Sequence, residues 1–177
     1  VALLVWLSVP ETAPDLPRGA KRIPTLAGVR LVPSLPGVWL QAVIVVCAYA
    51  GYKSIDDFTL FARDAYGYHD VQTARIGMLI FWVRPFAAVG AGLMGDIIGA
   101  SRVTALGFGV LLAGNLAIAL GFLQPGVYWM LIATIAALSA AIYALRGIYY
   151  ALFGEARVPL VFTGSAAGLV SVIGYTP

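Results

Sequence analysis

The chain has 177 residues, of which 61% are hydrophobic and only 11% are charged, and its formal net charge is +3. A soluble globular domain carries roughly 25% charged residues. This composition, with a mean hydropathy of +0.92, therefore excludes a soluble domain and indicates a membrane protein. The basic residues are spread over several loops and form no cluster on one face, so the pI of about 9.2 does not indicate nucleic-acid binding.

We expect the chain to be part of a longer protein. Residues 1–9 are apolar but too short to span a bilayer, and no basic segment precedes them, which favours the end of a preceding transmembrane helix over a signal peptide. Residues 10–36 contain six prolines and four basic residues, which is typical of a cytoplasmic linker. Residues 37–177 form the predicted bundle of five helices, truncated at its end. A complete small membrane protein is the alternative.

Each apolar segment of this bundle is close to the ~20 residues that an α-helix needs to cross a bilayer. We expect spanning helices over 37–65, 71–94, 102–123, 127–153 and 159–177. The turns at 96–102 and 154–158 then share the side of the basic linker. The positive-inside rule assigns that side to the cytoplasm. The single cysteine, Cys47, lies in an apolar run, so we expect it to be a small buried hydrophobic residue.

A polar stripe follows one face of the first predicted helix, because its members are three or four residues apart. The stripe comprises Gln41, Val45, Tyr49, Tyr52, Asp56, Thr59 and Arg63. A polar stripe on a membrane helix faces a protein interior or a water-filled cavity. Two alternatives stay open: the segment from Lys53 onward has left the membrane, or the two tyrosines are interfacial anchors.

Two arginines, Arg84 and Arg146, lie inside predicted spans. Arg84 precedes Asp96 by twelve residues, about 18 Å along a helix, and Arg146 precedes Glu155 by nine, about 13–14 Å. Half the hydrocarbon thickness is about 15 Å, so both lie near the midplane, where the sequence places no acidic residue. Guanidinium groups bind oxyanions through paired donors, which favours an anionic ligand. Alternatively, each arginine pairs with a carbonyl or with an acid from another segment.

Hydroxyl-bearing side chains share the helical face of Arg146. They are Ser139, Tyr143 and Tyr150. We predict a substrate-binding site formed by Arg84 and Arg146 with tyrosines 49, 52 and 143 and with Ser139.

Catalytic chemistry finds little support in the sequence. It contains no H-E-x-x-H motif, no Cys/His/Asp cluster and no phosphate-binding loop. The only histidine, His69, lies in a predicted loop, and no His or Lys is spaced to activate the serines at depth. We therefore expect neither an enzyme nor a bound metal or cofactor.

The segment between the second and third helices reads Gly92-x3-Asp96-x2-Gly99-x2-Arg102. It resembles the loop signature G-x3-D-[RK]-x-G-x-[RK]-[RK] of the major facilitator superfamily, in the form of its weaker second copy between helices eight and nine. Ile97 and Ser101 replace basic residues of that signature. The stretches VWLQAVIVVCAYAGYKSIDDFTLFARDAYGY and TGSAAGLVSVIGYTP look like those of bacterial inner-membrane members of the anion-transporting branches.

The resemblance implies an all-α, polytopic membrane fold, a partial six-helix bundle of a major facilitator transporter. The predicted helices would be the family's seventh to eleventh, and an N-terminal half would precede them. The implied function is movement of a small organic or inorganic anion by alternating access, with helices seven, eight, ten and eleven lining the cavity. A transport-like solute receptor is one alternative, and a carrier of neutral or cationic solutes with structural arginines is another.

The same resemblance assigns a conformational role to the loop motif and to Glu155, which follows the fourth predicted helix. By the predicted topology, Asp96, Arg102 and Glu155 lie on one side of the membrane. We expect the Asp96 carboxylate to interact with the N–H groups at the start of the next helix. We also expect Arg102 to reach Asp96 or Glu155, so that the cluster holds the cytoplasmic ends together. The alternative is a set of solvated loop charges.

Overall fold

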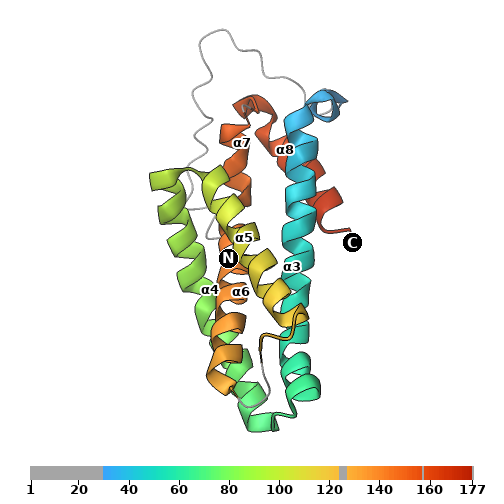
Figure 1. Ribbon diagram of the computed structural model, residues 1–177. Coiled ribbons are helices and arrows are strands. Elements are labelled where there is room, and N and C mark those ends of the chain that lie inside the picture. The colour runs from blue at the N-terminus through green and yellow to red at the C-terminus, as the bar shows by residue number, and fades with distance from the viewer. Residues whose placement is uncertain (1–29, 124–126, 157, 177) are drawn as a thin grey trace, which may run out of the picture.

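The computed structural model describes residues 30–123, 127–156 and 158–176, and the regular structure of these residues is entirely helical. Figure 1 shows long helices lying side by side along one common direction. In chain order the elements are η1 (Val32–Ser34), α3 (Pro36–Tyr66), α4 (Asp70–Ile98), α5 (Ala100–Ala119), α6 (Tyr128–Ile148), η2 (Tyr149–Ala151), α7 (Leu152–Glu155) and α8 (Leu160–Gly174). The all-α prediction is confirmed.

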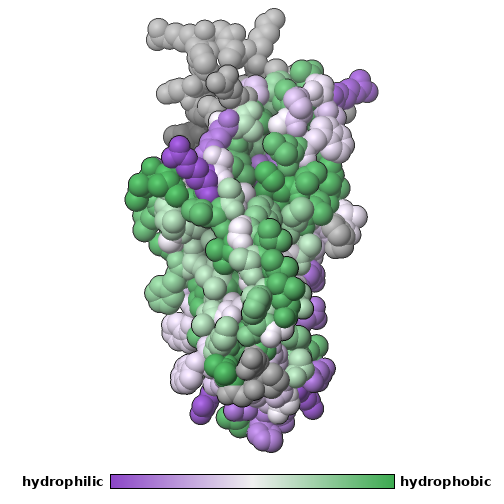
Figure 2. All heavy atoms as spheres, in the orientation of Figure 1, coloured by the Kyte–Doolittle hydropathy of each residue, from purple (hydrophilic) through white to green (hydrophobic). Residues whose placement is uncertain are grey.

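Within the described residues, four helices are long and apolar enough to cross a membrane, which indicates a polytopic helical membrane protein. They are α3, α4, α5 and the segment Tyr128–Glu155, which joins α6, η2 and α7. Hydrophobic residues cover much of the middle of the face drawn in Figure 2, and hydrophilic ones gather toward the ends and along one edge. Helix α8 is apolar but shorter than expected. Residues 1–9 and most of the predicted linker 10–36 lie outside the described residues.

The turn between α4 and α5 is much shorter than predicted. Helix α4 continues to Ile98 and α5 begins at Ala100, so the turn is the single residue Gly99. Its φ of +95° is a conformation that glycine adopts without the steric cost of a side chain. Asp96 and Arg102, which we predicted in a loop, therefore lie in the last turn of α4 and the first turn of α5.

Two further predictions need correction. The fourth span is not one continuous α-helix, because a 3₁₀ turn at Tyr149–Ala151 separates α6 from α7. Cys47 is exposed on α3 rather than buried. The apolar run around it indicated depth in the membrane, but an apolar residue of a membrane helix can face lipid as well as protein.

Small residues determine how closely the helices pack, and the most extensive contact is between α4 and α6. A Cβ atom added at Gly147 of α6 would lie 3.2 Å from the backbone oxygen of Ala88 on α4. Added Cβ atoms at Gly107 and Gly114 of α5 would come within 3.0 Å of Leu145 and Leu138 of α6. Close backbone approach through small residues is the usual means of helix association in lipid.

We expect Gly147→Ala to lower the thermal unfolding midpoint of the purified full chain in detergent, because the new methyl group would press on the backbone of α4. Gly90→Ala on α4 is the matched control, since nothing lies within 4 Å of its added Cβ atom. An alanine in an open helical position stabilises a helix by roughly 0.5–1 kcal/mol relative to glycine, so the control should unfold at an equal or higher temperature. A Gly147→Ala variant as stable as Gly90→Ala would contradict the close contact.

Candidate functional site

Arg84 is the central residue of α4, fourteen residues from both Asp70 and Ile98. Its side chain is exposed on the surface of the described residues. The guanidinium carbon lies 5.6 Å from the centre of the Tyr143 ring on α6. The position in the middle of an apolar helix agrees with the depth expected from the sequence, and the ring is a partner that helical spacing alone did not identify.

Arg146 lies in the last turn of α6 and is half-buried. Its guanidinium carbon is 3.9 Å from the centre of the Tyr52 ring on α3. Tyr143, whose ring lies beside Arg84, precedes Arg146 by three residues of α6, or ~4.5 Å of helical rise.

The two rings also contact each other. Tyr52 and Tyr143 pack edge to face, with centroids 6.4 Å apart, so the order in space is Arg84, Tyr143, Tyr52, Arg146. Each cation–π contact contributes about 0.5–2 kcal/mol, with the larger values in desolvated sites. We call these four residues the arginine–tyrosine cluster. It brings together three separate helices, α3, α4 and α6.

Further tyrosines extend the cluster toward α8. Tyr49 lies 6.3 Å from Tyr52 and 5.1 Å from Tyr175, measured between ring centroids. The hydroxyl of Tyr175 is 2.5 Å from that of Tyr149. Sequence reasoning missed Tyr149 and Tyr175. Tyr149 lies three residues after Arg146, a spacing that could have signalled it, whereas Tyr175 follows the end of α8 and had no periodic signal.

Ser139, a predicted member of the site, and Tyr150, which shares the predicted stripe of Arg146, have other surroundings. Ser139 is fully buried, and its hydroxyl has no hydrogen-bond partner among the described residues. It precedes Tyr143 by about one helical turn, on the side away from Arg146. Tyr150 is exposed, and its hydroxyl forms a 2.8 Å hydrogen bond with that of Ser171 on α8. The Tyr150 ring contacts that of Tyr149, with centroids 4.5 Å apart, so it joins the outer tyrosines rather than the four residues of the cluster.

Among the described residues, the two guanidinium groups of Arg84 and Arg146 contact tyrosine rings and form no ion pair with a carboxylate. Each guanidinium group carries five N–H donors. The cluster therefore combines two positive charges with hydrogen-bonding capacity for an oxyanion.

The predicted conformational motif has a different geometry from the one expected. The backbone N–H groups of Ala100 and Ser101 donate to the two carboxylate oxygens of Glu155, at 2.6 and 3.1 Å. The carboxylate that caps α5 is therefore that of Glu155, and the prediction that Asp96 would do so is wrong. Asp96 and Arg102 are exposed.

Two glycines of the motif differ in what surrounds them. A Cβ atom added at Gly99 would lie 3.4 Å from a carboxylate oxygen of Glu155, so this glycine leaves room for the cap as well as forming the turn. Gly92 is exposed on α4, and no atom of the described residues lies within 4 Å of its added Cβ atom.

Comparison of the sequence and the structure with protein-family models, with curated proteins and with solved structures finds no match. The indication of a membrane protein therefore depends on the four long apolar helices, and any narrower assignment depends on the residues themselves.

We expect Glu155→Ala to destabilise the full chain, because two N–H groups at the start of α5 would lose their acceptors. Asp96→Ala is the matched control, since it removes an exposed carboxylate from the neighbouring turn without removing the cap. Thermal unfolding in detergent should show a larger decrease for Glu155→Ala than for Asp96→Ala. Equal midpoints would contradict a capping role for Glu155.

Proposed function

We propose that this chain is most of the C-terminal half of a major facilitator transporter of a bacterial inner membrane, and that it moves a small organic or inorganic anion by alternating access. The observation that carries the proposal is the arginine–tyrosine cluster. Two cations on candidate spanning helices, at the expected level of the membrane interior, are linked through a contacting pair of tyrosine rings, and neither pairs with a carboxylate of the described residues. A charge at that depth is costly, and such residues commonly mark a substrate pathway.

The chemistry of the cluster favours an anion. The guanidinium carbons of Arg84 and Arg146 lie near the rings of Tyr143 and Tyr52, and neither group pairs with a carboxylate of the described residues, so each arginine has N–H donors to offer a ligand. Carboxylate, phosphate and nitrate accept paired hydrogen bonds of this kind. An anion between the two arginines would also compensate their charge, which no carboxylate of the described residues does by an ion pair.

The helices that meet at the cluster agree with the family arrangement. Helices α3, α4 and α6 supply its four residues, and α8 is joined to it through Tyr49 and Tyr175. In the family these would correspond to the lining helices seven, eight, ten and eleven. Helix α5 contributes no residue to the cluster, as expected for helix nine, which lies outside.

The exposure of Arg84 supports the proposal that a second half of the protein packs against the face of α4 that carries this residue. It is exposed in the middle of a candidate spanning helix, and a charged side chain at that level does not stably face hydrocarbon. In the proposed transporter the N-terminal half covers this surface, and the substrate site lies between the halves. The Glu155 cap, at the end of the same bundle, would act as the contact that holds the cytoplasmic ends of α5 and α7 together in one conformation.

One observation favours a second candidate function. Each arginine has a ring as a structural partner, which is also what a carrier of neutral or cationic solutes with structural arginines would show. A solute receptor with the same binding site is a further candidate. Uptake into proteoliposomes distinguishes a carrier from a receptor, and competition by anions distinguishes the two kinds of carrier.

We expect Arg84→Lys and Arg146→Lys to reduce anion uptake into proteoliposomes at least tenfold while expression is maintained. Lysine keeps the charge but loses the planar pair of donors, and a hydrogen bond to a charged group contributes about 1.5–3 kcal/mol, which is roughly tenfold or more. Arg63→Lys in the exposed last turn of α3 is the matched control. Normal flux and affinity in both cluster variants would exclude a role in substrate binding.

We also expect this half of the protein to provide no proton-coupling group. Asp56 and His69 are exposed, and His69 precedes the first residue of α4. Uptake driven by a pH gradient should therefore be the same in Asp56→Asn and in His69→Asn as in the unmodified protein; asparagine is chosen because it can also cap a helix. Loss of the response to the gradient in either variant, with uptake retained, would show the opposite.

A further inference from the structure

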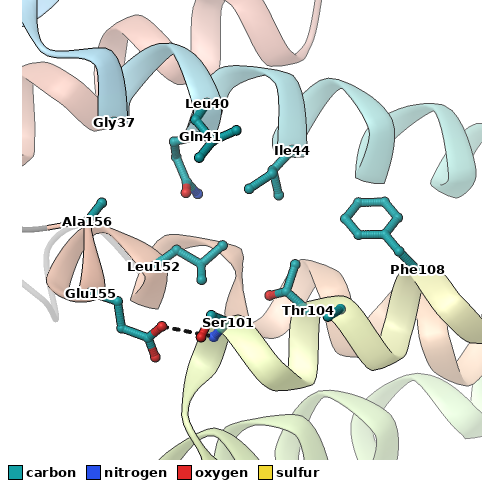
Figure 3. Close-up of a pocket in the computed structure, with 11 residues that line it drawn as sticks. Gly37, Leu40, Gln41, Ile44, Ser101, Thr104, Phe108, Leu152, Glu155 and Ala156 are labelled. Atoms are coloured by element: carbon teal, nitrogen blue, oxygen red, sulfur yellow. Dashed lines mark hydrogen bonds between the residues drawn. The ribbon is translucent and has the colours of Figure 1, made fainter.

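A groove separate from the arginine–tyrosine cluster lies at the end of the bundle where α3 and α5 begin and α7 ends. Its volume is about 430 Å³. Figure 3 shows α3 and α5 facing each other across the groove, with α7 at one end of it. Small-molecule sites occupy roughly 300–1,000 Å³, so the groove has room for one small ligand.

The lining of the groove is mostly apolar, and its four polar residues lie toward the end where α3 and α5 begin. Ser101 and Glu155 lie at its rim, at the start of α5 and the end of α7. Ile44 and Phe108 lie deeper, each eight residues from the first residue of its helix, or ~12 Å along the helix axis. The groove therefore suits an amphipathic ligand, with its polar end toward the rim and its apolar end toward Ile44 and Phe108.

Two buried polar side chains stand between the rim and the apolar part. Gln41 of α3 is 2% exposed, and Thr104 of α5 is 5% exposed. In Figure 3, Gln41 extends from α3 into the gap, and Thr104 lies opposite it on α5. The Thr104 hydroxyl has no hydrogen-bond partner among the described residues. A buried hydroxyl without a partner is costly, so a ligand that supplies one would gain from it.

The charges around the groove restrict the ligand. The carboxylate of Glu155 at the rim disfavours an anionic head group. Both of its oxygens accept backbone hydrogen bonds, which hold the carboxylate at the start of α5. Gln41 and Thr104 are uncharged, and a charged group placed between them would lose its hydration without gaining a counter-charge. The remaining class is an uncharged head group that carries hydroxyls.

We propose that this groove binds a single-chain lipid with an uncharged, hydroxyl-bearing head group, such as a monoacylglycerol. The hydroxyls lie between the rim and Thr104, and the acyl chain lies between Ile44 and Phe108. The ligand enters from the bilayer leaflet at the end of the bundle where α3 and α5 begin. This site shares no residue with the arginine–tyrosine cluster, so the proposal is independent of anion transport.

Photo-crosslinking of the full chain in liposomes tests the site. The probe is a monoacylglycerol with a diazirine in its acyl chain, and crosslinked residues are identified by mass spectrometry. We expect crosslinks within 37–44 and 101–108. Ala105→Trp, which places an indole in the groove, should abolish them. Ala113→Trp is the matched control on the same helix, because Ala113 does not line the groove.

Thr104→Val distinguishes binding from a structural role, since valine keeps the shape and removes the hydroxyl. We expect the apparent affinity for the probe to fall about fivefold, which is ~1 kcal/mol at 1.4 kcal/mol per factor of ten. If the hydroxyl served no ligand, the variant would label as well as the unmodified chain and would be no less stable to heat.

Competition identifies the chemical class. Unlabelled monoacylglycerol should displace the probe, whereas a fatty acid and an alkylamine of the same chain length should displace it at least tenfold less well. Equal displacement by all three would mean unspecific partition of acyl chains. That result, undiminished labelling in Ala105→Trp, or unchanged affinity in Thr104→Val would each overturn the proposal.

Discussion

The need to accommodate two guanidinium groups on apolar helices constrains this structure more than any other feature. A charge at bilayer depth costs at least several kcal/mol unless a partner compensates it. Here the recorded partners are tyrosine rings, which Arg84 finds on α6 and Arg146 finds on α3. Because each ring belongs to a different helix from its arginine, the two contacts and the Tyr52–Tyr143 pair between them hold α3, α4 and α6 in one arrangement.

Such contacts require that the helix backbones come close, and the small residues permit this. Gly147 follows Arg146 directly and faces the backbone of Ala88 on α4, one turn after Arg84. A close approach of α4 and α6 is therefore next to the cluster. Packing between helices in lipid has little hydrophobic driving force, so van der Waals contact at these glycines and the cation–π pairs stabilise the same interface.

The sequence was sufficient to predict the helical class and the position of Arg84 in the middle of an apolar helix, because both follow from long apolar runs. The number of helices and most of their boundaries follow from the same runs. The sequence was insufficient to identify the aromatic partners of the two arginines. Tyr52 and Tyr143 were candidates from their stripes, but periodicity describes one helix at a time and does not show which ring faces which arginine.

The capping carboxylate was misassigned for a related reason. Asp96 lies four residues before the start of α5 and was the nearest acid in sequence, whereas Glu155 lies 55 residues after Ala100 and reaches the same N–H groups through the fold. The one-residue turn at Gly99 keeps Asp96 within α4, where its side chain follows the helix surface. Local sequence distance is therefore a poor guide when a helix begins without a loop before it.

The break between α6 and α7 lies between the arginine–tyrosine cluster and the Glu155 cap. Tyr149 begins the 3₁₀ turn, three residues after Arg146 and six before Glu155. Its carbonyl accepts a hydrogen bond from the buried amide of Gln41 on α3. A buried hydrogen bond of this kind is expensive to lose unless another partner replaces it. Any rearrangement that separates α3 from the end of α6 must therefore break this bond as well as the contact of Arg146 with Tyr52. Because α7 follows without a loop, the short 3₁₀ turn is the covalent connection between Arg146 of the cluster and the Glu155 cap. A short 3₁₀ stretch within a helix is a common location for a hinge.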